Sequence, residues 1–196
     1  MKQWKVGILL FNEVEVLDFA GPYEVFAITA YPESTSKTFE VKTVAQTRKI
    51  IKARNGLQIM PDCCFADNPS FDILIIPGGH GAEEIEIHND TVLYWIKDQM
   101  SKVNLMASVC TGAFLLAKAG LLRGKKATTH WMDIDRLATE FNVDVLRGVK
   151  YVDEGLVMTS GGISAGINMS LYIIKKLLGE EVALTTAKRM EYDIDF

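Results

Sequence analysis

The sequence is poor in cysteine, in clustered basic residues and in long apolar runs. Its three cysteines are odd in number, two of them are adjacent at positions 63 and 64, and none forms a CxxC pair. Neither a disulfide framework nor a zinc site is therefore predicted. The 21 basic residues are scattered among 25 acidic ones, which excludes a nucleic-acid footprint or a membrane-surface patch. No segment approaches the roughly 18 apolar residues of a membrane-spanning helix. We expect a protein of the cytoplasm, a reducing compartment.

The 196 residues, 48% of them hydrophobic, suffice for one sizeable core, so we predict a single domain over residues 1–196. Apolar runs that suit strands alternate with segments of helical spacing. Strands are predicted at 4–11, 38–45, 58–60, 72–76, 104–109, 127–129, 143–146, 151–152 and 156–159, and helices at 23–31, 90–103, 113–119, 132–141, 167–178 and 180–190. This order is typical of an α/β sandwich with a mostly parallel sheet, which binds ligands beyond the carboxyl ends of its strands.

Cys110 is the candidate nucleophile. It follows a predicted buried strand and opens a helix, so its sulfur is expected at a helix N-terminus, where free N–H groups and the helix dipole favour a thiolate. Gly112 permits the close approach of helix and strand found in nucleophile elbows. The alternative is a buried structural cysteine, which is common in cores, but packing alone does not call for this turn. The other two cysteines fall in a predicted loop and are interpreted as bystanders.

Further polar groups are expected at the same edge of the sheet. Asp18 follows the first strand and precedes Gly-Pro, so it could share a proton with the thiol, although an aspartate before a helix also serves as an N-cap. Gly78 and Gly79 end another strand, and their N–H groups could donate to an oxyanion. His130 follows a predicted strand and is placed beside the pocket, although a lone histidine is more often structural.

Four segments carry a family resemblance. They are VGILLFNEVEVLDFAGPYEVF, DILIIPGGHG, SVCTGAFLLAKAGLLRGKKATTHW and VMTSGGISAGINMSLYIIKKLLGEEVA. Together they resemble the ThiJ/PfpI superfamily of class I glutamine amidotransferase-like proteins, its isonitrile hydratase branch in particular, nearly end to end. The resemblance implies a flavodoxin-like three-layer sandwich with a cysteine on an elbow, commonly a homodimer. The closing AKRMEYDIDF is similar to that branch's tail, so we expect no DNA-binding module after this domain.

The resemblance also implies roles for single residues. Cys110 is implied as the nucleophile, Asp18 as its acid/base partner, and Thr111 as the residue that follows the cysteine in isonitrile hydratases. Protease-like members carry histidine at that place, and amidotransferases carry a histidine and an acid near the C-terminus, where this chain has residues 164–166, Ser-Ala-Gly. A Cys-His-acid hydrolase is therefore disfavoured. Asn168 departs from the aspartate that is frequent in this branch, which leaves the local charge of the pocket open.

The activity implied by the resemblance is hydration of an isonitrile to an N-substituted formamide through a covalent thioimidate, without a metal or an organic cofactor. The backbone N–H groups of Gly78, Gly79 and Thr111 are expected to stabilise developing charge. One alternative is glyoxalase or deglycase action on reactive carbonyls. Another is a non-enzymatic redox or ligand sensor that uses the oxidation of Cys110. In each case the expected partner is a small molecule.

Overall fold

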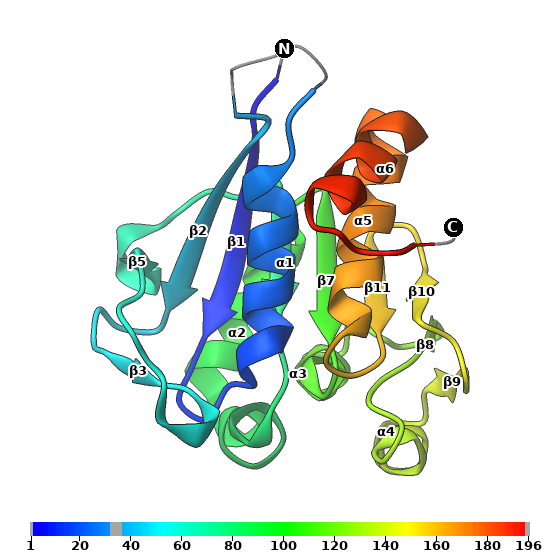
Figure 1. Cartoon of the computed structure of the whole chain (residues 1–196). Helices are drawn as coiled ribbons and strands as arrows, with labels where there is room; N and C mark the ends of the chain where they lie inside the picture. Colours follow the sequence, from blue (N-terminus) through cyan, green and yellow to red (C-terminus); the bar gives the residue numbers. More distant parts are fainter. Residues whose placement is uncertain (1, 32–36, 195–196) are drawn as a thin grey trace.

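A seven-stranded sheet forms the centre of the protein (Figure 1), whose computed structural model describes residues 2–31 and 37–194. The strand order is β10-β11-β7-β6-β1-β2-β5, and every neighbouring pair is parallel except β10 and β11. The strands are β1 (Trp4–Leu10), β2 (Phe39–Ala45), β5 (Cys63–Cys64), β6 (Ile73–Ile76), β7 (Leu105–Val109), β10 (Tyr151–Asp153) and β11 (Val157–Ser160). The predicted α/β class with a mostly parallel sheet is thus confirmed.

Helices cover both faces of this sheet. In Figure 1, α1 (Val16–Ile28), α5 (Ala165–Leu178) and α6 (Glu180–Arg189) lie in front of it, while α2 (Asp90–Met100) and α3 (Gly112–Lys118) lie behind. α4 (Ile134–Phe141) lies below the carboxyl ends of the strands. Two small ladders pair β3 (Ile51–Lys52) with β4 (Gln58–Ile59), and β8 (Lys126–Ala127) with β9 (Asp144–Val145). In the described part of the chain, no helix has the length and apolarity to cross a membrane.

The two central strands β6 and β7 form the middle of the core. Every residue of both strands is buried, as expected for strands of a parallel sheet that is covered on both faces by helices. Their continuous apolar runs made them predictable from the sequence. β7 ends at the lower edge of the sheet in Figure 1, and its parallel neighbour β6 ends at the same edge. The Gly78-Gly79 loop follows β6, and Cys110 follows β7.

The first helix begins earlier than predicted. α1 starts at Val16, so the Gly21-Pro22 pair lies inside the helix and does not precede it. A Cβ at Gly21 would lie 3.0 Å from Cγ1 of Ile167 on α5, so the glycine lets the two helices pack closely. Pro22 accepts helical φ but lacks the N–H that would bond to the Asp18 carbonyl. The helix tolerates this loss within its first two turns.

The cysteine pair at 63 and 64 was wrongly predicted to lie in a loop. Cys63 and Cys64 form the edge strand β5, pair in parallel with Val44 and Ala45 of β2, and are both buried. A strand of two residues gives no periodic signal, which is why the sequence does not reveal it. The predicted strand at 58–60 exists as β4, but it pairs with β3 outside the main sheet.

Gly112 sits where α3 meets the end of β6. A Cβ at this position would lie 2.1 Å from the carbonyl oxygen of Ile76 and 2.8 Å from that of Pro77. Because both atoms belong to the backbone, neither can move aside cheaply. We expect Gly112→Ala to lower the free energy of unfolding by about 3 kcal/mol through overpacking, as measured by urea denaturation.

Gly161→Ala is the matched control for this prediction. A Cβ at Gly161 would meet its nearest neighbour, Cβ of Ala165, at 3.6 Å, an ordinary contact. The control is expected to stay within about 1 kcal/mol of the wild type. Equal stability losses in the two variants would contradict the packing argument.

Candidate active site

Cys110 occupies a strained turn between β7 and α3. Its φ is 55°, in the left-handed region that is unfavourable for residues other than glycine. Two hydrogen bonds hold the turn: the Cys110 N–H donates to the Gly161 carbonyl at 3.2 Å, and the Thr129 hydroxyl donates to the Cys110 carbonyl at 2.8 Å. The predicted elbow is therefore present. No pattern around Thr129 predicts its supporting role.

Asp18 lies in the first turn of α1 and is fully buried. Its Oδ2 accepts a hydrogen bond from the Gly78 N–H at 3.0 Å, while Oδ1 has no hydrogen-bond partner among the described residues. The N-cap of α1 is Glu15, so the alternative role of Asp18 as an N-cap is wrong. Burial raises the pKa of Asp18 to about 7, against the lowering effect of the Gly78 hydrogen bond. The carboxyl can therefore both hold and release a proton near neutral pH.

The thiol of Cys110 and the carboxyl of Asp18 interact. Burial raises the pKa of Cys110 above its ordinary value, and the negative charge of Asp18 raises it further, while the Thr111 N–H that donates to the sulfur lowers it. The expected preference for a thiolate at the helix N-terminus is thus not met, because burial and the carboxylate outweigh the short helix α3. In the resting site the thiol keeps its proton beside a carboxyl that can accept it.

The two glycine N–H groups expected to face an oxyanion are already engaged. The Gly78 N–H donates to Asp18, and the Gly79 N–H donates to Oγ1 of Thr111 at 2.9 Å. Neither N–H is therefore a free donor in this structure, and their role towards an oxyanion stays a prediction. Their observed effect is to fix the carboxyl of Asp18 and the hydroxyl of Thr111 beside Cys110.

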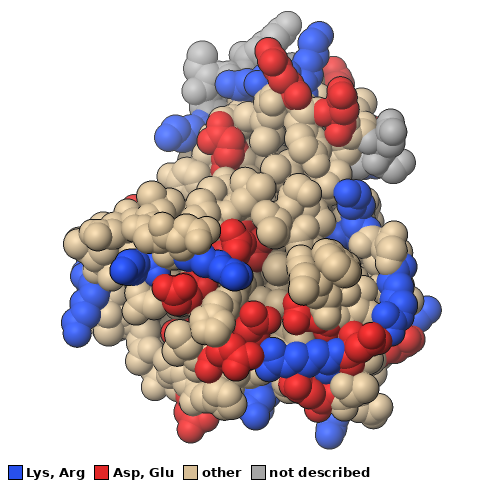
Figure 2. Space-filling model, turned by 60° about the horizontal axis from the view of Figure 1, so that its bottom comes forward, with Lys and Arg blue, Asp and Glu red and all other residues tan. Residues whose placement is uncertain are grey.

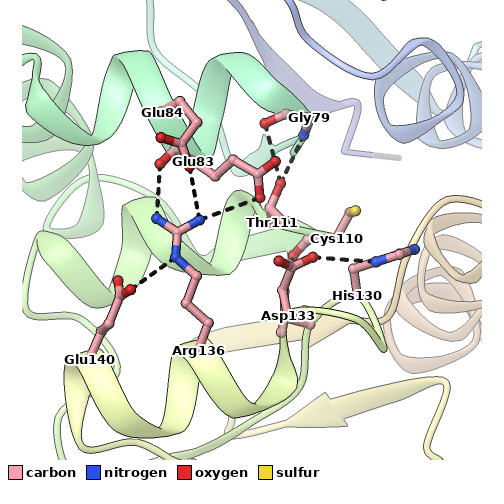
Figure 3. Close-up of polar contacts among 10 residues, drawn as sticks. Gly79, Glu83, Glu84, Cys110, Thr111, His130, Asp133, Arg136 and Glu140 are labelled. Atoms are coloured by element: carbon pink, nitrogen blue, oxygen red, sulfur yellow. Dashed lines mark hydrogen bonds and ion pairs between the residues drawn. The ribbon is translucent and has the colours of Figure 1, made fainter.

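A cavity of about 250 Å³ opens onto Cys110 and Thr111. His130 lines it as predicted, with Nδ1 3.3 Å from Oδ2 of Asp133; Figure 3 shows both side chains beside the cysteine. The remaining lining residues are Glu15, Arg54, Gly79, Glu83, Met132 and Ile163. The volume is below the roughly 300 Å³ at which drug-sized pockets begin, so this cavity suits small ligands. A larger hollow of about 580 Å³, beside Lys97 and Phe141, holds none of the predicted site residues.

Several lining residues were missed by sequence reasoning. Asp133 lies three residues after His130, a spacing that could have suggested a pair. Glu83 belongs to a π-helical turn, Gly81–Ile85, which has no sequence signal. Ile163 has a φ of 52°, which is unusual for a β-branched residue and marks strain at the site.

Asn168 lies away from the cavity. Its Oδ1 accepts a hydrogen bond from the Tyr192 hydroxyl at 3.0 Å, and it is not among the residues that line the Cys110 pocket. The difference from the frequent aspartate therefore concerns the packing of the C-terminal segment on α5. The last two residues of that segment, 195 and 196, lie outside the described residues.

The raised pKa of Asp18 predicts a pH-dependent stability. The carboxyl has an ordinary value of 3.8 and a pKa of about 7 in the folded protein, so between these pH values the folded state binds an extra proton. Its contribution to the free energy of unfolding is therefore expected to be present below pH 4 and to be lost as the pH rises towards 7. Urea denaturation of the wild type and Asp18→Asn over this range measures that loss, which the variant should lack.

Asp98→Asn is the control for this experiment. Asp98 is a surface carboxylate of α2 that pairs with Lys102, and its removal should leave the wild-type pH dependence between 4 and 7 in place. If Asp18→Asn retained the same pH dependence as the wild type, the raised pKa would be refuted.

Cys110 occupies a strained turn between a strand and a helix, at the edge of a parallel sheet where the strands end, and a buried carboxyl lies beside it. These features place the chain among the α/β proteins with a nucleophile elbow. Within that class, the chain belongs to the DJ-1/PfpI family, whose model matches residues 4–176. The resemblance expected from the four sequence segments is thus confirmed.

Individual relatives differ in activity. The chain is 36% identical to an isonitrile hydratase of Pseudomonas putida over 188 residues, which cover 96% of this chain and 78% of the relative. It is 28% identical to the deglycase PH1704 of Pyrococcus horikoshii, covering 86% and 93% of the two chains. It spans only 50% of the HTH-type transcriptional regulator GbdR of Pseudomonas aeruginosa, at 26% identity and 96% coverage of this chain. A solved ThiJ/PfpI family protein of Pseudomonas syringae superposes with a TM-score of 0.88 at 27% identity, covering 100% and 78%.

Proposed function

We propose that this protein hydrates a small isonitrile to an N-substituted formamide, with Cys110 as nucleophile and Asp18 as acid/base. The observation that carries the proposal is the buried Asp18 carboxyl, with a pKa of about 7, interacting with the Cys110 thiol beside a cavity for a small ligand. The 36% identity to an isonitrile hydratase supports this reaction among those known for the family.

In the first step, the carboxylate of Asp18 takes the thiol proton while the sulfur attacks the terminal carbon of the isonitrile. Asp18 then delivers that proton to the same carbon, which gives a covalent thioimidate, Cys–S–CH=N–R. The N–H of Thr111 stabilises the sulfur as it loses its proton. A thiol with a raised pKa thus becomes reactive only when a ligand shares the cavity with it.

In the second step, water adds to the thioimidate carbon. Asp18 now removes a proton from the water, the nitrogen gains one, and a tetrahedral Cys–S–CH(OH)–NHR forms. The C–S bond breaks, the sulfur regains its proton, and the formamide leaves. The hydroxyl of Thr111, held by the Gly79 N–H, and the ring of His130 flank this chemistry and are assigned to substrate binding.

Incubation with small alkyl isonitriles tests the proposal. Mass spectrometry should detect the formamide in solution and, in quenched samples, an adduct with the mass of the isonitrile on the Cys110 peptide. If neither the formamide nor the adduct is detected after prolonged incubation, the hydratase proposal is refuted. Peroxide oxidation of Cys110 without turnover of any substrate would favour the sensor instead.

Carbonyl chemistry is the second candidate, because the chain shares 28% identity with a deglycase and a thiol beside a carboxyl also suits attack on an aldehyde. Consumption of methylglyoxal by the same preparation, without activity on isonitriles, would establish it. We also propose that the chain acts as one domain in the cytoplasm and as a homodimer. Sedimentation analysis of the intact protein can test the homodimer.

A further inference from the structure

The wall of the Cys110 cavity carries more negative than positive charge. Three carboxylates line it, those of Glu15, Glu83 and Asp133, against the guanidinium of Arg54 and the imidazole of His130. Even if His130 were protonated, three negative groups would face two positive ones. The side chains of the three acids are about one-fifth exposed, so water screens them only in part.

Both basic groups of the wall already face an acidic partner. Nη1 of Arg54 lies 3.7 Å from Oε2 of Glu15, and Nδ1 of His130 lies 3.3 Å from Oδ2 of Asp133. An anionic ligand would have to compete with these carboxylates for each cation. Glu83 is the carboxylate left without a basic partner among the residues of the wall itself.

A single arginine outside the cavity wall compensates Glu83 only in part. Arg136 lies 3.8 Å from Glu83, but it lies closer to Glu84, at 3.1 Å, and to Glu140, at 3.0 Å (Figure 3). One positive charge is thus shared by three negative ones. Burial raises the pKa of Glu83, and the negative charge of the neighbouring Asp133 raises it further. Figure 2, in which the lower side of the molecule in Figure 1 comes forward, shows acidic side chains gathered over the middle of that side, with basic ones among them.

We propose that the cavity rejects anionic ligands and accepts neutral and cationic ones, and that Glu83 is the residue that sets this preference. A carboxylate-bearing molecule would add a further negative charge to a small, partly enclosed space, where repulsion is stronger than in bulk water. For turnover, the inference rests on the proposed function and names its substrates as isonitriles without a negative charge. For access to the thiol, it rests on the charge of the wall alone.

Thiol modification tests access without turnover. Methanethiosulfonates with a neutral methyl, a cationic trimethylammonioethyl or an anionic sulfonatoethyl group are compared by their rates on the Cys110 peptide, each divided by the rate with 2-mercaptoethanol, a neutral thiol. We expect the cationic reagent to react on the order of 10-fold faster than the anionic one at low salt, with the ratio shrinking as salt rises. A ratio near one, or no reaction of Cys110 with any of the three reagents, overturns the inference.

A pair of variants assigns the effect to its residue. Glu83→Gln should lower the ratio of cationic to anionic rates several-fold. Glu84→Gln removes a charge bound to the same Arg136 but outside the cavity lining, so its effect should be smaller. Equal effects of the two variants, or no effect of Glu83→Gln, would show that Glu83 does not set the preference.

Three isonitriles extend the test to turnover. The neutral 3,3-dimethylbutyl isonitrile, its cationic isostere (2-isocyanoethyl)trimethylammonium and the anion 3-isocyanopropanoate are compared by kcat/KM for formamide production. The anion should be the poorest substrate by about 10-fold or more. If none of the three is hydrated while the thiol reagents still discriminate by charge, the hydratase proposal fails and the charge selection stands. If the anion is hydrated with the same kcat/KM as the neutral compound, the charge selection fails and the hydratase proposal stands.

Discussion

Replacing Cys110 by serine is expected to abolish formamide production, with a loss in kcat on the order of 10⁴-fold or more. A serine hydroxyl is a far weaker nucleophile than a thiol, and it gives up its proton less readily to Asp18, whose pKa is about 7. The measurement is formamide formed from a small alkyl isonitrile, with mass spectrometry of the peptide that contains position 110. No adduct should form on that peptide.

Cys64→Ser is the matched control for the nucleophile. Cys64 is also a buried, free cysteine, but it lies in the edge strand β5 and its side chain caps the short turn Phe65–Asp67. Serine suits such a capping position, so the fold and the activity are expected to persist. If the two substitutions reduced activity equally, the loss could not be assigned to chemistry at Cys110.

Asp18→Asn is expected to lower kcat on the order of 10³-fold, because the amide can neither take the thiol proton nor deliver it to carbon. The substitution keeps the volume of the side chain and an oxygen that can accept the Gly78 hydrogen bond. Circular dichroism should therefore show an intact fold. Retention of activity within about 10-fold would place proton transfer on another group.

Alkylation of Cys110 tests whether Asp18 transfers protons during the reaction or only makes the thiol more reactive. The negative charge of Asp18 raises the pKa of Cys110, so its removal should lower that pKa. The rate of reaction with iodoacetamide in Asp18→Asn should therefore rise at a lower pH than in the wild type. The variant would combine a more reactive thiol with a much slower hydratase, a result that loss of the thiolate cannot produce.

The sequence allowed the sheet and the elbow to be predicted because their signals are local. The strands β6 and β7 are continuous apolar runs, and Gly112 marks the place where a helix must approach a strand closely. α1 was predicted to begin too late because Pro22 is read as a helix breaker, whereas here the packing of Gly21 on α5 maintains the helix around it.

The candidate site was predictable only in its centre. Cys110, Asp18 and His130 follow or lie close to strand ends, so the topology of a parallel sheet alone brings them to one edge. Glu83 and Asp133 reach the cavity from a π-helical turn and from the residue before α4, and no periodicity in the sequence marks either. The engagement of the Gly78 N–H by Asp18 also depends on loop geometry, since the two residues lie 60 positions apart.

The left-handed backbone at Cys110 sets a limit on how stable this fold can become. A glycine would adopt that conformation freely, whereas every other side chain costs on the order of 1 kcal/mol or more there. Natural or engineered variants selected for heat resistance alone should therefore drift towards glycine at this position and lose the sulfur. A stabilised form that still needs its thiol must gain its extra free energy elsewhere, in elements remote from this turn.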